Sequence, residues 1–252
     1  MADTVMSSFK AGVRTITLNR PERLNAIGGT LCADLIAAFE AAGNCPDTRA
    51  IVLTGAGRSF CSGDDLLEFE QQSSSPAAAR HHIEAIQSAS RAILYSPHMV
   101  VGAVHGWAAG GGLEWMLNCD LTVMADDARC FFPEVSLGWN VTGGASTILP
   151  RLVGLQKARE LILFGEKFGA EEAKALGIAW RVVPRAEMLA LAQATGERIA
   201  ALPRGAVSDL KQLLNRAAYC DIESAMAMET SYAVRQLLGP ETRAQIAKFA
   251  KR

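Results

Sequence analysis

The fold is decided by residues 99–124, which read MVVGAVHGWAAGGGLEWMLNCDLTVM. The apolar, β-branched run 99–104 is typical of a buried strand, and the glycine-rich turn HGWAAGGG follows it. A helix is expected from this turn through Met116, and a second buried strand over 120–124. Two buried strands joined by a helix are typical of a parallel sheet, so this segment predicts an α/β protein.

The same alternation extends outward from this segment. Toward the N-terminus we expect strands and helices over 13–18, 30–42, 49–54 and 76–95. After Pro150 amphipathic helices dominate, and we expect them around 156–164, 170–176, 186–202, 205–218 and 221–238, with one short strand over 178–183. The chain is therefore divided into an α/β core, 1–184, and a helical C-terminal region, 185–252. Because that region is so apolar, we expect it to pack as a layer rather than to extend as an appendix.

Composition excludes several classes of protein. The 252 residues include 25 Lys and Arg against 26 Asp and Glu, so no broad positive field attracts nucleic acid or anionic membranes, and neither partner is expected. The six cysteines form no CxxC pair, and the first ten residues, MADTVMSSFK, lack the apolar stretch of an export signal. We expect reduced thiols in a cytoplasmic protein.

Common catalytic motifs are also missing. The sequence contains no HExxH, GxSxG or GxxxxGK[ST], which argues against a zinc hydrolase, a serine hydrolase and a P-loop NTPase. The loop GAGRSF (55–60) begins like a dinucleotide fingerprint, but Phe60 replaces its third glycine. Asp64 and Asp65 are interpreted as acids of a helix first turn, and the histidines show no ligand spacing, so no metal is expected.

The three glycines at 110–112 indicate where chemistry takes place. Glycine weakens a helix, so this helix start requires bare backbone for another reason. One interpretation is an oxyanion hole, in which the unpaired N–H groups of the helix N-terminus bind a developing negative charge. The alternative is close packing of the turn against another element.

Two carboxylates stand in apolar surroundings. Glu114 follows the glycines, and Glu134 precedes an uncharged stretch that runs from 135 to 150. Isolated buried acids are suited to general acid–base catalysis because burial shifts their pKa toward neutrality. For Glu114 a solvated helix face or a structural ion pair is the alternative.

Four stretches in order resemble the crotonase (enoyl-CoA hydratase/isomerase) superfamily: NRPERLNA (19–26), GAGRSFCSGDDL (55–66), HGWAAGGGLEWMLNCDLTVMADDARCFFPEVSLG (105–138) and RLVGLQKARELILFGEKFGAEEAKALGIAWRVVP (151–184). The resemblance implies a spiral of repeated ββα units, and a helical C-terminal region that mediates trimerisation. It also implies a homotrimer or a hexamer of two trimers. The implied substrate is an acyl-CoA thioester, with no further cofactor because coenzyme A is part of the substrate.

The resemblance also assigns roles to residues. The backbone N–H groups of Asp64 and Gly111 match the two oxyanion-hole donors, and Glu114 and Glu134 match the two glutamates that add water to a 2-enoyl-CoA. Glu114 is expected to take a proton from water and Glu134 to supply one to C2. Relatives that only move a double bond usually lose the first glutamate, so a hydratase is favoured. A double-bond isomerase, a hydratase-lyase or a non-catalytic acyl-CoA-binding homologue remains as an alternative.

Binding residues follow from the same motifs. Those expected to contact the CoA portion or the thioester are Arg23, Ser62, Asp64, Asp65, Leu66, Leu67 and Gly111. Those expected to form the acyl pocket are Trp115, Trp139, Asn140 and Val141, because VTGGA (141–145) departs from the family's Pro-Gly-Ala-Gly-Gly turn. Asp64 departs from the usual small residue, so its carboxylate is expected to point away from the enolate. The end FAKR (249–252) resembles a basic end that reaches a neighbour's CoA.

Overall fold

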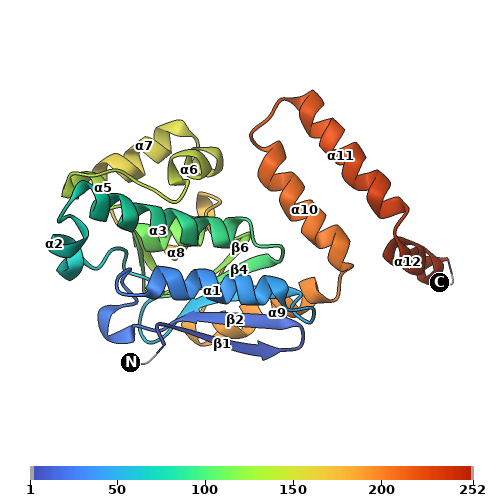
Figure 1. The fold of residues 1–252 in the computed structure, drawn as a ribbon, viewed down its shortest axis with the longest axis horizontal. Helices are drawn as coiled ribbons and strands as arrows, with labels where there is room; N and C mark the ends of the chain where they lie inside the picture. Colours follow the sequence, from blue (N-terminus) through green and yellow to red (C-terminus); the bar gives the residue numbers. More distant parts are fainter. Residues whose placement is uncertain (1–2, 251–252) are drawn as a thin grey trace.

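A computed structural model of the chain describes residues 3–250 and shows a parallel sheet enclosed by helices (Figure 1). The main sheet runs in the order β1 (Val5–Lys10), β2 (Val13–Leu18), β3 (Ala50–Gly55), β4 (Met99–Val104), β6 (Leu121–Ala125) and β9 (Arg181–Val183). All neighbouring pairs are parallel except the antiparallel hairpin of β1 and β2. The buried strands predicted from apolar runs are confirmed to within one residue at each end.

A second, smaller sheet lies next to the glycine-rich turn. It comprises β5 (Trp107–Ala109), β7 (Arg129–Phe131) and β8 (Phe168–Gly169), and an isolated bridge joins Cys61 to Ala108. The sequence predicted none of these strands, nor β1. Strands of two or three residues are too short to show an alternating pattern, and β1 is mostly exposed, so it lacks a buried face.

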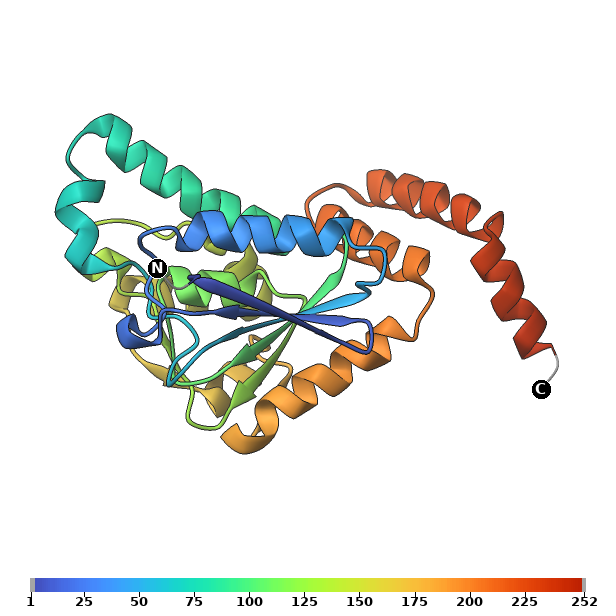
Figure 2. The ribbon, with the colours of Figure 1, turned by 60° about the horizontal axis from the view of Figure 1, so that its bottom comes forward.

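Helices cover both faces of the main sheet. On one face lie α1 (Leu31–Asn44) and α3 (Pro76–Leu94), and on the other lies α9 (Arg185–Ala200), as Figure 2 shows. The α1 helix buries Leu31, Leu35, Phe39 and Ala42, whose spacing of three or four residues makes one continuous stripe. Each face of the sheet thus carries its own apolar layer.

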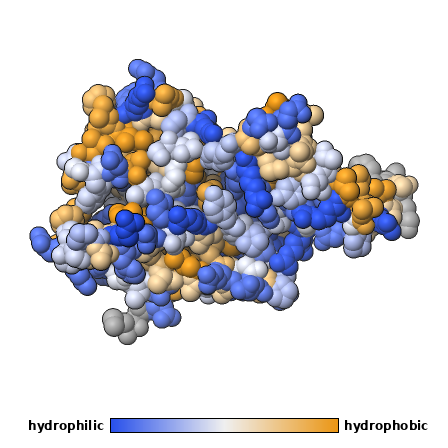
Figure 3. All heavy atoms as spheres, turned by 45° about the horizontal axis from the view of Figure 1, so that its top comes forward, coloured by the Kyte–Doolittle hydropathy of each residue, from blue (hydrophilic) through white to orange (hydrophobic). Residues whose placement is uncertain are grey.

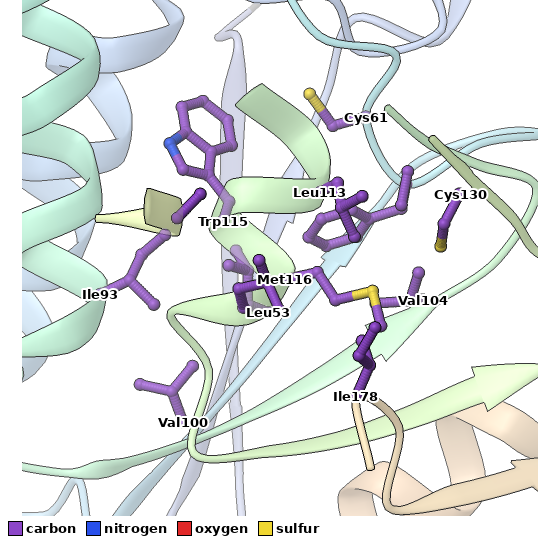
Figure 4. Close-up of a cluster of buried hydrophobic side chains, with 14 of the residues drawn as sticks. Leu53, Cys61, Ile93, Val100, Val104, Leu113, Trp115, Met116, Cys130 and Ile178 are labelled. Carbon is purple, nitrogen blue, oxygen red and sulfur yellow. The ribbon is translucent and has the colours of Figure 1, made fainter. Parts of the chain in front are cut away.

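Short helices complete the core. They are η1 (Pro21–Arg23), η2 (Leu66–Glu68), α2 (Phe69–Gln72), α4 (Gly111–Leu117), α5 (Glu134–Leu137), α6 (Ala145–Val153), α7 (Leu155–Phe164) and α8 (Ala170–Ala175). All seven residues of α4 are buried, and Trp115 and Met116 pack among strand and helix side chains there (Figure 4). The glycine-rich turn therefore opens a helix at the centre of the protein.

The C-terminal helices extend away from this core. After α9, which packs on the sheet, the helices α10 (Arg204–Ala217), α11 (Ile222–Leu237) and α12 (Pro240–Phe249) form a projecting arm (Figure 1). The expectation of a packed layer is therefore correct for α9 and wrong for α11 and α12. Figure 3 shows hydrophobic surface at the end of the arm. The apolar side chains exposed on these two helices include Ile222, Met226, Val234, Leu237 and Ile246. Of the basic end, residues 251–252 lie outside the described residues.

Helix α10 is fastened to the core by one buried cation. Nζ of Lys211 lies 2.7 Å from Oδ2 of Asp120 and donates to the carbonyl oxygens of Ile93 and His98. We expect Lys211→Met to lower the free energy of unfolding by about 3–5 kcal/mol, because it leaves a buried carboxylate without its cation. Urea unfolding measures this loss. Lys157→Met removes an exposed ion pair with Glu160 and is expected to cost at most about 1 kcal/mol; equal losses would contradict the prediction.

None of the helices within residues 3–250 combines the length and the apolar character needed to cross a bilayer.

Candidate active site

A cavity of about 170 Å³ lies between helix α3 and the glycine-rich turn. Five of the residues singled out in the sequence line it: Asp64, Gly111, Glu134, Trp139 and Asn140. The rest of its wall is mainly apolar and comes from α2, α3 and the loop after α5. Segments distant in the sequence thus meet at one concave site, which is the usual location of a ligand.

The three glycines serve both of the purposes considered for them. A Cβ at Gly112 would stand 2.3 Å from the carbonyl oxygen of Cys61, so this position requires close packing. Gly111, however, lines the cavity as the first residue of α4. The first N–H group that bonds back into the helix turn is that of Glu114, to the carbonyl of Gly110 at 3.0 Å, so the helix itself leaves the amide of Gly111 unpaired.

Asp64 lines the same cavity, and its backbone pairing fixes the direction of its amide. It forms an isolated parallel bridge with Ile27, in which the N–H of Ile27 donates to Gly63 and the N–H of Asp65 donates to Ile27. In a parallel bridge the groups on either side of the central residue are bonded, and the N–H of that residue points the opposite way. The amide of Asp64 is therefore directed away from Ile27.

Glu134 is the carboxylate that faces the cavity. Its side chain is 5% exposed, and Oε2 has no hydrogen-bond partner within residues 3–250. Burial, together with smaller contributions from the charges of Glu114 and Asp64, raises the pKa of this carboxyl to about 7. A carboxyl with this pKa gains and loses a proton near neutral pH.

Glu114 is held behind the cavity wall by Thr142. The backbone N–H of Thr142 donates to Oε1 at 2.5 Å and its hydroxyl donates to Oε2 at 2.6 Å. Glu114 is 1% exposed, which excludes a solvated helix face. Burial raises the pKa of its carboxyl, and the two bonds from Thr142 oppose that rise. Thr142 itself lines the cavity, whereas Glu114 is not among the lining residues.

The raised pKa of Glu134 predicts a pH-dependent stability. Between its ordinary value of 4.5 and about 7, the folded protein binds a proton that the unfolded chain has lost. The contribution is therefore fully present below pH 4.5 and is lost as the pH rises through about 7. We expect Glu134→Gln to be more stable than the wild type at pH 8, by at most about 3 kcal/mol, and no more stable at pH 4. Urea unfolding at both pH values measures this, and a pH-independent difference would contradict it.

The residues expected to contact coenzyme A are divided between structural and exposed positions. The carboxylate of Asp65 is buried in ion pairs with Arg20 at 3.1 Å and Arg23 at 3.2 Å, and it caps η2 by accepting from Leu67 N. Both oxygens of Asp65 thus fix the loop, and a contact of this residue with CoA stays a prediction. The helix-start interpretation of Asp65 is confirmed. Arg23 is half-buried, whereas Leu66 and Leu67 are exposed, and a contact with CoA stays a prediction for Arg23, Ser62, Leu66 and Leu67.

The four residues predicted to form the acyl pocket occupy different places. Trp139 and Asn140 line the cavity, but Trp115 is fully buried in the core (Figure 4), and Val141 packs against that same core without lining the cavity. Successive residues of a helix point about 100° apart, so the side chains of Glu114 and Trp115 point in different directions. Trp115 points into the core.

Sequence reasoning missed several residues of the wall. The ring of Phe69 stacks on Trp139 with centroids 5.9 Å apart, and Nε2 of His82 lies 3.2 Å from Oδ1 of Asp64. His82, one of the histidines without ligand spacing, lines the cavity, as do Gln72 and Thr142. The departure of VTGGA (141–145) from the family's turn is a signal in the sequence for the region of Thr142. No local signal marks His82, because its role depends on how α3 lies across the turn.

Within residues 3–250 no group of three His, Cys, Asp or Glu side chains is placed to hold a metal ion.

Comparisons with known proteins agree with this fold. Residues 8–239 match the family model described as Enoyl-CoA hydratase/isomerase. The chain is 32% identical to the short-chain-enoyl-CoA hydratase of Clostridium acetobutylicum, over 90% of this chain and 87% of the relative. It is 31% identical to the 1,2-epoxyphenylacetyl-CoA isomerase of Escherichia coli, over 92% and 89%. The crystal structure of an enoyl-CoA hydratase from Polaromonas sp. JS666 superposes with a TM-score of 0.94 at 30% identity, covering 98% of this chain and 96% of that one. The expected crotonase fold is confirmed.

Proposed function

The chain belongs to the enoyl-CoA hydratase/isomerase (crotonase) family, and from this premise we propose that it adds water to the 2,3 double bond of a 2-enoyl-CoA to give a 3-hydroxyacyl-CoA. The observation that carries the proposal is Glu134, a residue of the cavity wall whose buried Oε2 has no hydrogen-bond partner within residues 3–250. The pKa of its carboxyl is about 7, and the charge of a second buried carboxylate, Glu114, contributes to that rise. A pair of buried acids at one site is suited to moving two protons.

The thioester oxygen binds to backbone donors in this mechanism. The N–H groups of Asp64 and Gly111, both on the cavity wall, donate to that oxygen as negative charge develops on it. Because neither amide is used by the local backbone pairing described above, both are available without rearrangement. One such donor typically contributes about 10²- to 10³-fold to the rate.

The two glutamates then divide the proton transfers. A carboxylate accepts about four hydrogen bonds, and Thr142 supplies two to Glu114, so Glu114 retains capacity for a water molecule. Glu114 takes a proton from that water as the oxygen attacks C3. Protonated Glu134 delivers its proton to C2 of the enolate, for which a pKa about 7 is well matched.

A double-bond isomerase is the second candidate. It is favoured by one observation: Thr142 engages both oxygens of Glu114, which leaves Glu134 as the glutamate that lines the cavity. An isomerase needs one group that removes a proton from one carbon and returns it to another, and Glu134 is placed for that.

The test follows the conjugated enoyl-thioester absorbance with purified protein and a panel of 2-enoyl-CoAs of different chain length. Loss of absorbance together with a product heavier by one water, carrying ¹⁸O in labelled water, supports the hydratase. A gain of absorbance with 3-enoyl-CoAs and no reaction of 2-enoyl-CoAs supports the isomerase. No change with either series overturns both and favours a protein that binds acyl-CoA without turnover.

We also propose a homotrimer, or a hexamer of two trimers, formed through the projecting C-terminal arm. The apolar side chains exposed on α11 and α12 support this, because a surface of this kind is usually covered by a partner. Arg23 and the exposed Leu66 and Leu67 are proposed to contact the CoA portion. Light scattering coupled to size exclusion measures the oligomeric state, and a monomer at micromolar concentration contradicts it.

A further inference from the structure

The cavity contains a polar pair that hydration does not use. Oδ1 of Asp64, from the loop after β3, lies 3.2 Å from Nε2 of His82, on α3. Both side chains line the cavity and are about four-fifths buried, with 21% and 18% of their surface exposed. The contact occupies one carboxylate oxygen and one ring nitrogen. Oδ2 of Asp64 and Nδ1 of His82 therefore have capacity for other partners.

The surroundings of this pair are those of an acyl-binding site. Ile83, Ile86 and the stacked rings of Phe69 and Trp139 form an apolar wall in the same cavity. A carboxylate loses hydration in such a place, and this cost is offset when a bound group hydrogen-bonds to it. An acyl chain that fills the cavity thus meets apolar surface and one polar contact.

The position of Asp64 and His82 limits which carbon of the acyl chain can carry the polar group that binds to them. In the proposed mechanism the amide of Asp64 holds the thioester oxygen. Its carboxylate carbon is only two bonds from the Cα of the same residue, so it reaches the first few carbons of the acyl chain. A hydroxyl fits this pair because its O–H can donate to Oδ2 of Asp64 or to Nδ1 of His82, which is an acceptor when Nε2–H donates to Oδ1 of Asp64. An anionic group, in contrast, would be repelled by Asp64.

We propose that Asp64 and His82 form a specificity subsite that selects acyl-CoAs carrying a hydroxyl group just beyond C3. This inference rests on the proposed function for the orientation of the thioester. An acyl chain without a hydroxyl would cover Asp64 and His82 and leave their remaining polar atoms without a hydrogen-bond partner. A site built to hydrogen-bond a hydroxyl discriminates strongly against the analogue that lacks it.

The test is a binding measurement with saturated acyl-CoAs, which have no double bond to hydrate. Calorimetry compares 4-hydroxybutanoyl-CoA with butanoyl-CoA on the full-length protein. The wild type is expected to bind the hydroxylated compound at least about tenfold more tightly. In His82→Leu and in Asp64→Ala the two compounds are expected to bind with about equal affinity. His81→Leu, a change at the exposed neighbouring histidine of α3, is expected to keep it.

Two results overturn the subsite: equal affinities in the wild type, or a preference that both the His82 and the Asp64 variant retain. The outcome is separable from that of the proposed function. A hydroxyl preference in a protein that hydrates no enoyl-CoA removes the hydratase proposal alone. Hydration by a protein that binds both saturated compounds equally removes the subsite alone.

Discussion

Replacing Glu134 with glutamine is expected to lower kcat for hydration of the best 2-enoyl-CoA by about 10²- to 10⁴-fold. Glutamine keeps the shape of the side chain in the cavity but has no acidic proton to deliver to C2. The binding surfaces remain, so KM is expected to change little. Steady-state kinetics on the purified variant measures both values.

Glu187→Gln is the matched control, because Glu187 is an exposed carboxylate on α9 away from the cavity, and its kcat is expected to equal that of the wild type. Glu114→Gln separates the two candidate reactions. In a hydratase it lowers kcat about as strongly as Glu134→Gln, because each glutamate handles one proton. In an isomerase only the Glu134 variant loses activity. A Glu134 variant within a few-fold of the wild type would contradict both mechanisms.

Replacing Gly106 with alanine is expected to lower the free energy of unfolding by about 2–5 kcal/mol. Gly106 lies between β4 and β5 with a φ of +56°, and a Cβ there would stand 2.0 Å from the carbonyl oxygen of Arg58. The backbone conformation alone costs an L-residue about 1–2 kcal/mol, and forcing the loop of Arg58 outward adds the rest. Urea unfolding followed by circular dichroism measures the change.

Gly29 provides the control for backbone conformation. It has a φ of +55° and no atom within 4 Å of an added Cβ, so Gly29→Ala is expected to cost only about 1–2 kcal/mol. The difference between the two variants isolates the steric term. Equal decreases in the free energy of unfolding of the two variants would show that the loop of Arg58 moves away from the added Cβ without an energetic cost. The Arg58 loop continues to Asp64, so Gly106→Ala is also expected to reduce activity.

Local sequence patterns were sufficient for the buried strands of the main sheet and for the helices that cover it. Strands β2, β3, β4 and β6 follow directly from short apolar, β-branched runs, because a buried strand needs little besides such a run and a turn on each side. The projecting arm shows the limit of this reasoning. An apolar helix face indicates that another surface covers it, but it does not indicate whether that surface belongs to the same chain. On α11 and α12 the apolar side chains remain exposed.

By itself the sequence determined the α/β architecture, the family resemblance, and the presence of Gly111, Glu134 and Asp64 on one cavity wall. Only the tertiary structure decided which further side chains join them. Thr142 holds Glu114 behind the wall, and His82 pairs with Asp64 because α3 lies across the glycine-rich turn. Periodicity tells which face of a helix is buried, whereas contacts between segments distant in the sequence depend on the packing of the whole core.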